Sequence, residues 1–339
     1  MPPLRIFLTG ATGFIGGYLL PQLAKEQYRV ICLARKIHEV PETRHFDNVQ
    51  WVEGDLNAPS SIKGLLHGVD AVLHLASSRY RTFNFSDMAC KSFYQVNVLG
   101  SMYLAREAAA AGVKRFVYLS STAAMGLARG SGPRINESWD CFPVFPYQKS
   151  KWMAEQALMD LFHKEKLPVI ILRPCLVAGG GKQNSELLQM LQLIRKGLFP
   201  VVGNMRSQVK PLVWVEDVVE AILLSMYRGT PGSIYLITSG EDYTFAQILS
   251  EAARLLGVKK GYIHLPYSAA YLAATGLEWV GKGLNLQPPW TRARLQLLVS
   301  DRAMDISKAK GELGFAPKVT SLDEMLGRLY EYYRERGLL

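Results

Sequence analysis

The sequence predicts an α/β fold, in which a doubly wound parallel sheet is joined to a smaller mixed domain toward the C-terminus. Two observations support this prediction. An apolar run at residues 6–8 breaks into a glycine-rich turn and continues as a helical pattern, and the residues that follow repeat strand, helix and strand. About half of the 339 residues are hydrophobic and a fifth are charged, which is ordinary for a globular protein.

The first turn has glycines at positions 10, 13 and 16. Gly10 allows the chain to turn tightly, Gly13 lets the backbone approach a pyrophosphate, and Gly16 lets the following helix pack closely on the strand. The helix N-terminus presents free N–H groups and a partial positive charge to a phosphate. Because the turn lies between a strand and a helix, it predicts a dinucleotide-binding loop.

The second strand is predicted at residues 29–33, and it is followed by Ala34, Arg35 and Lys36. An acidic side chain here would accept a hydrogen bond from the adenosine ribose 2′-hydroxyl and favour NAD. The cations Arg35 and Lys36 suit the 2′-phosphate of NADP instead, so NADP is the expected cofactor and NAD is the second choice. The alternative interpretation is a solvated pair of charges at the end of a strand.

Further strands are predicted at residues 49–52, 71–75, 116–119 and 169–172, with a long helix over about 87–111. His74 lies in the apolar fourth strand and is interpreted as a satisfied core histidine. Aromatic and basic side chains follow this strand at Arg79, Tyr80, Arg81, Phe83 and Phe85. They either wall a pocket, because ligands bind at the carboxyl ends of parallel strands, or pack within their loop.

The fifth strand ends in Ser120, Ser121 and Thr122, and a loop rich in Gly, Ser and Pro leads to a helix that begins near Tyr147. Tyr147 and Lys151 lie on one face of that helix because they are four residues apart. The lysine cation and the charge of a bound cofactor would lower the pKa of the phenol, so Tyr147 could act as general acid or base. This spacing is a weak signal alone, and its position behind a serine-rich strand end gives it weight.

Taken together, these motifs resemble those of the extended short-chain dehydrogenases/reductases, the NAD-dependent epimerase/dehydratase superfamily with a Rossmann-type sheet. The matching segments of the first half are Thr9-Gly10-Ala11-Thr12-Gly13-Phe14-Ile15-Gly16, Gly54-Asp55-Leu56, His74-Leu75-Ala76, Asn97-Val98-x-Gly100, Ser120-Ser121, Tyr147-x-x-x-Lys151 and Arg173-Pro174. The second half matches through Val215-Glu216-Asp217-Val218, the segment 300–309 and Glu312-Leu313-Gly314-Phe315-x-Pro317. The set is specific for the superfamily but not for one reaction.

The resemblance implies a role for each matching residue of the site. Ser121 would hydrogen-bond the reacting carbonyl or alcohol, with Thr122 as the alternative if the alignment slips by one. Tyr147 would donate or accept the proton, and Lys151 would bind the nicotinamide ribose and tune Tyr147. Asn97 would support this set, or else it is a buried side chain that caps a backbone group. The implied cofactor contacts are Gly10, Thr12, Gly13, Phe14, Ile15, Gly16, Arg35, Lys36, Asp55, Leu56, Leu75, Ala76, Ser77, Tyr147, Lys151 and Pro174.

The sequence departs from the sugar-nucleotide enzymes of this superfamily at two places. Leu176 stands where they typically carry an asparagine that reaches the nucleotide diphosphate, and Lys210 stands in place of a further polar contact. The pattern Arg-Pro-x-x-Val at residues 173–177 resembles the 3-beta-hydroxysteroid dehydrogenase and dihydroflavonol reductase branch instead. The apolar segment 267–280 could line a pocket, although core packing is the favoured interpretation.

The expected function is therefore reversible NAD(P)-dependent oxidation of a secondary alcohol to a ketone on a bulky, mostly apolar small molecule. The alternative is a nucleotide-sugar epimerase or dehydratase, in which Arg292 and Arg294 could hold a diphosphate. A third reading is a non-catalytic cofactor-binding subunit, against which the set of Ser121, Tyr147 and Lys151 argues.

The resemblance also implies an organisation for the whole chain. A nucleotide-binding domain is expected at 1–175 plus about 211–238, and a substrate domain at about 176–210 and 239–339. Homodimers are usual in this superfamily, so the resemblance alone implies a homodimer, and no segment of the sequence indicates an interface. The net charge of +10, without any basic run, favours phosphorylated cofactors or anionic substrates over nucleic acid.

Cysteine usage and apolar segments indicate a cytoplasmic protein. No Cys-x-x-Cys pair occurs, so the cysteines are interpreted as reduced residues rather than a disulfide framework or a metal site. The first strand begins almost at once, which leaves no room for a signal peptide, and the longest apolar stretch, 265–280, is too short and interrupted to span a bilayer. The four cysteines are Cys32, Cys90, Cys141 and Cys175.

Overall fold

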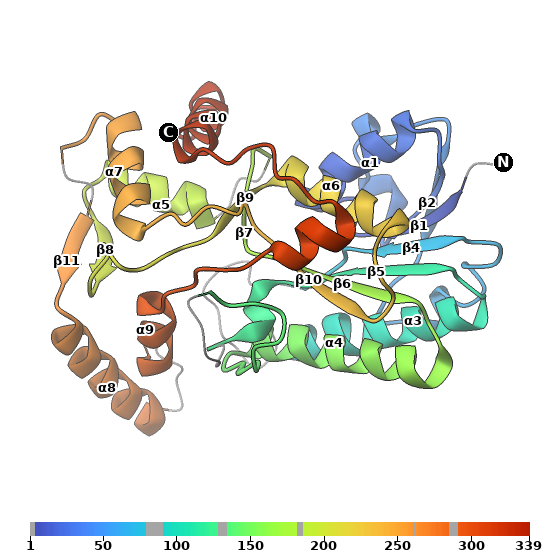
Figure 1. Cartoon of the computed structure of the whole chain (residues 1–339), viewed down its shortest axis with the longest axis horizontal. Helices are drawn as coiled ribbons and strands as arrows, with labels where there is room; N and C mark the ends of the chain where they lie inside the picture. The colour runs from blue at the N-terminus through green and yellow to red at the C-terminus, as the bar shows by residue number, and fades with distance from the viewer. Residues whose placement is uncertain (1–3, 79–90, 128–133, 182–185, 260–261, 285–290) are drawn as a thin grey trace.

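The computed structural model describes residues 4–78, 91–127, 134–181, 186–259, 262–284 and 291–339. Its largest layer is a seven-stranded parallel sheet with the strand order β10-β6-β5-β4-β1-β2-β3 (Figure 1). The order reverses beside β1, as in a doubly wound sheet, so the predicted fold class is confirmed. The strands are β1 (Arg5–Thr9), β2 (Arg29–Ala34), β3 (Val49–Glu53), β4 (Ala71–His74), β5 (Arg115–Leu119), β6 (Val169–Pro174) and β10 (Ser233–Ile237).

Successive side chains of β1 point to opposite faces of the sheet and belong to two different cores. Ile6 and Leu8 belong to the core shared with α1 and α6, whereas Phe7 belongs to the core shared with α3 and α4. All three side chains are fully buried, as expected for a strand covered on both faces. Figure 1 shows these helices as two layers, one on each side of the sheet. Their bounds are α1 (Phe14–Lys25), α3 (Ser101–Ala110), α4 (Pro146–Glu165) and α6 (Val215–Tyr227).

A second group of elements lies beside the large sheet (Figure 1). Its short strands pair in parallel, β7 (Leu176–Ala178) with β9 (Leu212–Trp214), and β8 (Phe199–Val202) with β11 (Tyr262–Leu265). The buried side chains of α5, α7 and α10 form an apolar cluster of their own, separate from the two cores of the large sheet. The helices of this group are α5 (Glu186–Arg195), α7 (Phe245–Leu255), α8 (Tyr267–Leu284), α9 (Arg292–Val299) and α10 (Leu322–Glu335).

Helix α8 differs from its sequence-based interpretation as core packing. Its small residues Ala270 and Ala274 are buried, but Leu272 is 71% exposed and Trp279 is 77% exposed. Figure 1 shows the reason: α8 lies at the outer end of the molecule, far from the large sheet. An apolar composition therefore does not place this segment in the core, because too few elements surround it.

The helix predicted over about 87–111 is partly confirmed. A π-helical turn, Tyr94–Gly100, runs directly into α3. Single π-helical turns are rare and occur frequently at functional sites. None of the described helices is long and apolar enough to cross a membrane. The proposed pocket wall after β4 lies outside the described residues, as does Cys90; the wall consists of Arg79, Tyr80, Arg81, Phe83 and Phe85.

Candidate active site

The carboxyl ends of the parallel strands form one edge of the sheet, and the predicted site residues gather there. Neighbouring parallel strands bring the residues that follow them to the same edge, which is where ligands bind in doubly wound sheets. In strand order this edge holds Asp55 after β3, Arg35 after β2, Gly10 after β1, Leu75 after β4, Ser121 after β5 and Pro174 at the end of β6.

The glycine turn fits a dinucleotide pyrophosphate in its own geometry. Gly10 has a φ of +76°, and a Cβ there would lie 2.7 Å from the backbone nitrogen of Ala76. A Cβ on Gly16 would collide with the Gly10 carbonyl, so the close packing of α1 on β1 requires glycine here. The Gly13 N–H donates to the Gly10 carbonyl at 2.9 Å and closes the turn. Helix α1 then begins at Phe14 and presents the N-terminus that a phosphate needs.

Other predicted cofactor contacts lie around this turn. Thr12 is exposed on it, and Ile15 is partly buried in the first turn of α1. Leu56 is 5% exposed after β3 and packs so closely on Gly100 that a Cβ on this glycine would lie 2.8 Å from Leu56 Cβ. The π-helical turn is thereby held against the loop that follows β3.

One basic side chain on the glycine turn was missed by the sequence interpretation. The Arg44 guanidinium donates to the carbonyl of Ala11 and lies against the first turn of α1. Arg35 is exposed at the end of β2, and Lys36 forms an exposed ion pair with Glu39 at 2.6 Å. Arg44 lies in a short 3₁₀ turn, Glu42–Arg44, between β2 and β3, and no pattern in the sequence indicated its position.

A buried hydrogen-bond chain runs from β1 to the π-helical turn. The Thr9 hydroxyl lies 2.6 Å from Nδ1 of His74, and Nε2 of His74 lies 2.8 Å from the Ser101 hydroxyl. Thr9 Oγ1 also accepts from the Ala76 N–H, and Ser101 donates to the Asn97 carbonyl. One tautomer, with the proton on Nε2, satisfies every group. Burial lowers the pKa of His74 to about 3, so it is a neutral core histidine, as predicted.

Asn97 lies in the π-helical turn and joins two parts of the site. Its amide oxygen accepts from the Ser78 N–H at 2.7 Å and from the Ser77 hydroxyl at 3.1 Å. Its amide nitrogen donates to the Ser78 carbonyl and to the Ser150 hydroxyl, both at 2.9 Å. Ser150 in turn donates to the Tyr147 carbonyl at 2.8 Å. Asn97 therefore caps backbone groups, and in doing so it fixes the loop after β4 to the first turn of α4.

Lys151 is 2% exposed, although its side chain carries a charge at low pH. Its Nζ donates to the Leu119 carbonyl at 2.9 Å and to the Tyr118 hydroxyl at 3.3 Å. No carboxylate among the described residues lies within ion-pair distance of it. Burial lowers the pKa of Lys151 to about 7, while the charge of Glu155 one helical turn away opposes the shift. Because this pKa lies near neutral pH, a negative group nearby would strongly increase the fraction of Lys151 that is protonated.

The buried Lys151 should make the free energy of unfolding depend on pH in a definite direction. The unfolded chain holds this proton up to about pH 10.4, whereas the folded chain releases it near pH 7. Between these values the unfolded state binds more protons, so stability rises with pH. Compared with Lys151→Met, the cofactor-free wild type should gain about 2 kcal/mol between pH 7 and pH 9.

Urea titrations at both pH values measure this difference. Lys149→Met is the matched control, because it removes an exposed lysine from the same helical turn and should leave the pH dependence unchanged. A Lys151→Met protein with the same pH dependence as the wild type would contradict the burial of this charge.

Beneath Lys151, α4 carries a buried ion pair. Glu155 and Arg173 are joined by two hydrogen bonds, Nε to Oε1 at 3.0 Å and Nη2 to Oε2 at 2.6 Å. Their side chains are 0% and 3% exposed. The Ser120 hydroxyl also donates to Glu155. The pair therefore joins α4 and β6, and Ser120 links it to the end of β5, one residue before Ser121.

Ser121 and Tyr147 lie on elements that pack against each other. The Ser121 hydroxyl accepts a backbone N–H at 3.1 Å and caps the 3₁₀ turn Thr122–Met125, against which α4 packs. The partly buried Tyr147 ring meets Phe93 edge-on, with 5.9 Å between ring centroids. Ser121 is partly accessible whereas Thr122 is buried, which makes Ser121 the better placed of the two hydroxyls.

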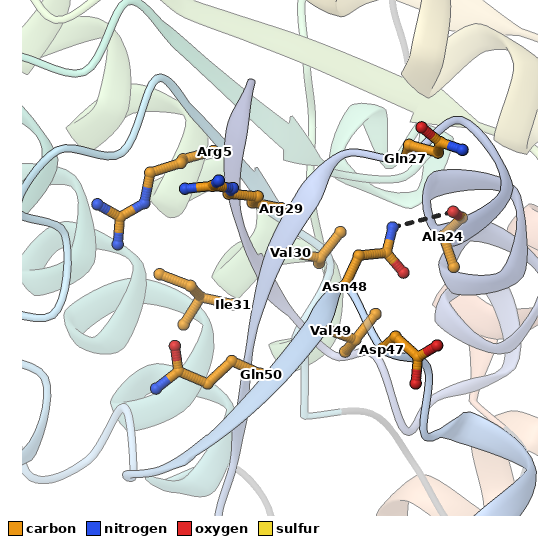
Figure 2. Close-up of a pocket in the computed structure, with 10 residues that line it drawn as sticks. All are labelled: Arg5, Ala24, Gln27, Arg29, Val30, Ile31, Asp47, Asn48, Val49 and Gln50. Atoms are coloured by element: carbon orange, nitrogen blue, oxygen red, sulfur yellow. Dashed lines mark hydrogen bonds between the residues drawn. The ribbon is translucent and has the colours of Figure 1, made fainter. Parts of the chain in front are cut away.

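A cavity of about 860 Å³ lies at the opposite edge of the sheet. Arg5 and Arg29 border it at the starts of β1 and β2, and Asn48 borders it just before β3 (Figure 2). Asn48 donates to the Ala24 carbonyl at 2.9 Å and so joins this edge to α1. Because the predicted site residues lie at the carboxyl ends of the strands, this cavity is separate from them.

Comparisons with known proteins agree with this geometry. The family model described as the NAD dependent epimerase/dehydratase family matches residues 6–238. A UDP-glucose 4-epimerase from Vibrio cholerae is 28% identical over 253 residues, which cover 74% of this chain and 75% of that protein. The sterol demethylase protein B of Methylococcus capsulatus is 29% identical over 345 residues, covering 99% and 100%. A 2-alkyl-3-oxoalkanoate reductase from Stenotrophomonas maltophilia is 25% identical over 337 residues, covering 96% and 98%.

Among solved structures, that of gox2253 has a TM-score of 0.82 with this chain, at 28% identity and with 99% of each chain covered. The family match spans more than half of the chain and includes the glycine turn together with Tyr147 and Lys151. The chain therefore belongs to the NAD dependent epimerase/dehydratase family and is an NAD(P)-dependent oxidoreductase enzyme.

Proposed function

We propose that this enzyme interconverts a secondary alcohol and a ketone on a bulky, mostly apolar substrate. The observation that carries the proposal is the pair Tyr147 and Lys151 on α4, which packs against the turn that Ser121 caps. Relatives that align over almost the whole chain support it, because one of them is named as a reductase of a 2-alkyl-3-oxoalkanoate. The Vibrio cholerae epimerase aligns over a smaller share, 74% of this chain.

In this proposal a bound nicotinamide cofactor supplies or accepts the hydride, and the residues of the chain transfer the proton and position the substrate. The Ser121 hydroxyl donates to the carbonyl oxygen of the substrate. The Tyr147 phenol passes its proton to the same oxygen as the ketone is reduced. The Lys151 cation lowers the pKa of that phenol and binds the ribose of the cofactor. Asn97 acts through other groups, because it holds α4 and the loop after β4 together.

We also propose that residues 1–175 and about 211–238 hold the cofactor, and that about 176–210 and 239–339 hold the substrate. Leu176 is 39% exposed just after β6, where a nucleotide diphosphate would meet an alkyl group instead of an amide. Arg292 could replace that partner, but its guanidinium already pairs with Glu278 at 2.8 Å. Both observations favour an apolar ketone over a nucleotide sugar.

The second candidate function is that of a nucleotide-sugar epimerase or dehydratase, since the Vibrio cholerae relative is an epimerase. In that case the hydride returns to the substrate within one turnover, and no net cofactor is consumed. Arg294 belongs to this alternative, and its side chain lies outside what the structure describes. A third candidate is a subunit that binds the cofactor without catalysis, and a single positive turnover assay would exclude it.

A paired screen separates these functions. Absorbance of NADPH and NADH is followed with a panel of apolar ketones and aldehydes, and product analysis is run in parallel with uridine and thymidine sugar nucleotides. We expect net cofactor consumption with ketones. Calorimetric titration should show that the sugar nucleotides bind poorly, and low-micromolar binding by any of them would favour the epimerase instead.

We propose that NADP is preferred over NAD. Arg35 at the end of β2 is the main determinant, and Arg44 beside the glycine turn is a second cation. A charge-assisted hydrogen bond to the 2′-phosphate contributes roughly 1.5–3 kcal/mol, so NADPH should bind about tenfold to a hundredfold tighter than NADH. Arg35→Asp should reverse this order, because the carboxylate repels the phosphate and accepts from a 2′-hydroxyl. Dissociation constants for both cofactors measure the change.

The matched control is Arg29→Asp, which reverses a charge at the opposite end of the same strand. It should leave the ratio of the two dissociation constants unchanged. Equal affinities of the wild type for NADPH and NADH would show that the enzyme uses NAD or both cofactors.

A further inference from the structure

Two cations meet beside the turn that follows Ser121. The Arg302 guanidinium donates to the Gly126 carbonyl at 2.5 Å and to the Ser300 hydroxyl at 3.3 Å. Lys210 Nζ donates to the carbonyl of the same Ser300 at 2.9 Å. Residues that are far apart in the sequence, one before β9 and one after α9, therefore place two positive charges around a single residue.

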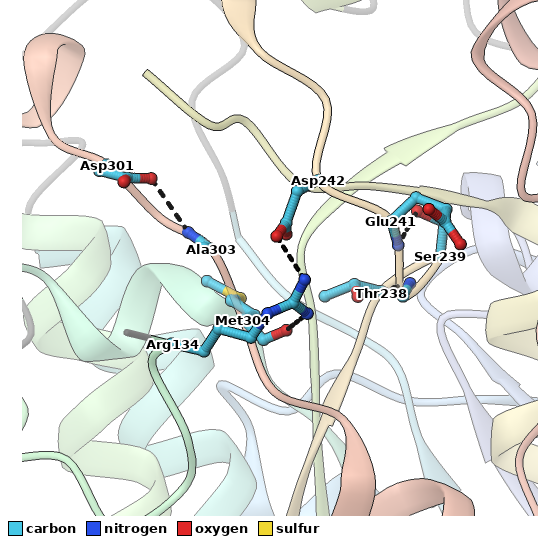
Figure 3. A network of polar contacts seen from close by, with 9 residues as sticks. Arg134, Thr238, Ser239, Glu241, Asp242, Asp301, Ala303 and Met304 are labelled. Atoms are coloured by element: carbon cyan, nitrogen blue, oxygen red, sulfur yellow. Dashed lines mark hydrogen bonds and ion pairs between the residues drawn. The ribbon is translucent and has the colours of Figure 1, made fainter. Parts of the chain in front are cut away.

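Burial affects both of these charges. Burial lowers the pKa of Arg302, and burial together with the charge of Arg302 lowers the pKa of Lys210 to about 8. The charge of Asp301 opposes the shift at Lys210, but the Asp301 side chain is exposed and accepts from the Ala303 N–H at 3.3 Å (Figure 3). Within the described part of the chain, Arg302 forms no ion pair with any carboxylate.

A neighbouring arginine shows the contrast. Arg134 donates to the Met304 carbonyl at 3.2 Å and pairs with the Asp242 carboxylate (Figure 3). Arg134 is thus neutralised within the protein, although it contacts the same segment that carries Arg302. Burying an arginine without a carboxylate is costly unless another anion balances the charge.

A small cavity of about 90 Å³ opens beside Arg302. Its polar lining residues are Ser300, Asp301 and Arg302, and its apolar side includes Met125, Ile135 and Met304. This volume accommodates a carboxylate with a water or two, since one water needs about 10–15 Å³ of such space. Met125 belongs to the 3₁₀ turn that Ser121 caps, so the cavity adjoins the proposed catalytic residues.

We propose that Arg302 binds a carboxylate on the substrate, with the charge of Lys210 close by, so that the enzyme acts on an oxo acid or hydroxy acid with an apolar body. This inference rests on the proposed function, because it names the substrate class of the same site. A guanidinium offers a carboxylate two parallel N–H donors, and an ammonium adds a point charge. The substrate would thus supply the counter-charge that Arg302 lacks among the described residues.

Matched acids and esters test this inference. The probes are medium-chain oxo acids with the ketone at different distances from the carboxylate, each beside its methyl ester, assayed with NADPH. For at least one chain position, kcat/KM should be tenfold to a hundredfold higher for the acid than for its ester, as expected for one or two charge-assisted hydrogen bonds. Arg302→Gln should remove this preference by lowering kcat/KM for the acid much more than for the ester.

Two further variants separate charge from packing. Arg302→Lys keeps the charge and should retain part of the preference for the acid. Arg134→Gln removes an already paired arginine near the same segment and should leave the acid-to-ester ratio unchanged. An equal kcat/KM for acid and ester at every chain position, or an equal loss for both in Arg302→Gln, would overturn the inference.

A binding measurement distinguishes this inference from the proposed function. Calorimetric titration of the wild type and Arg302→Gln with the same acids and esters, in the presence of NADP, needs no turnover. Selective binding of acids that Arg302→Gln abolishes, without any oxidation or reduction, would support the carboxylate site and contradict the proposed reaction. Turnover of ketones without selectivity for acids would support the reaction and contradict the carboxylate site.

Discussion

Replacing Tyr147 with phenylalanine should lower kcat by about 10²–10⁴-fold and leave the dissociation constant of the cofactor almost unchanged. Only the phenol proton is lost, because the ring of phenylalanine can keep the edge-on contact with Phe93 at 5.9 Å between centroids. The anchors of this helical turn involve other groups, since Ser150 donates to the backbone carbonyl of Tyr147. Steady-state kinetics and a cofactor titration on the same preparation measure both quantities.

The control for this substitution is Tyr330→Phe, which removes a phenol from α10 and should leave kcat unchanged. Near-wild-type turnover of Tyr147→Phe on a verified substrate would mean that another group handles the proton. A parallel loss of cofactor affinity would mean that Tyr147 acts mainly in binding.

Replacing Glu155 with alanine should lower the free energy of unfolding by about 3–5 kcal/mol. The substitution leaves the Arg173 cation buried without its two hydrogen bonds to carboxylate, and it leaves the Ser120 hydroxyl without an acceptor. Urea titration of the wild type and the variant, with the transition followed by circular dichroism, measures the loss.

Asp160→Ala is the matched control on the same helix. Asp160 forms an exposed ion pair with Lys164 at 3.7 Å, so its removal should change stability by no more than about 0.5 kcal/mol. If Glu155→Ala lowered the free energy of unfolding by less than about 1 kcal/mol, the buried ion pair would not stabilise the fold as its geometry indicates.

The large sheet could be predicted from the sequence because its strands are buried on both faces. Such strands appear as short apolar runs between turn residues, and β1 and β2 begin at or within one residue of the predicted starts. The strand order was not predicted, since spacing alone does not say which strands pair. Helix α8 shows the limit of this reasoning, because its apolar residues did not indicate how few elements surround it.

Parts of the candidate site that come from one segment could also be predicted. The glycine turn and the pair Tyr147 and Lys151 depend on local spacing, which the sequence displays directly. Glu155 lies on the same helical face one turn later, so the four-residue spacing could have indicated it, but its partner Arg173 lies on another element.

The remaining residues depend on contacts between distant segments. Arg44 reaches the glycine turn from a 3₁₀ turn between β2 and β3, and Arg302 reaches the Gly126 carbonyl from the other half of the chain. No periodic pattern or motif marks either side chain. A three-dimensional structure was needed to show that Arg302 and Lys210 lie around one residue, Ser300.

The central claim is that hydride passes between the cofactor and a ketone at a site served by Tyr147 and Ser121. The most direct test is reduction of an apolar oxo acid with NADPH that carries deuterium at both C4 positions of the nicotinamide, with product analysis by mass spectrometry. The account predicts one deuterium on the new carbinol carbon for each NADPH consumed, and loss of this transfer in Tyr147→Phe. Isomerisation of a nucleotide sugar without net NADPH consumption, together with no deuterium transfer to any ketone, would contradict it.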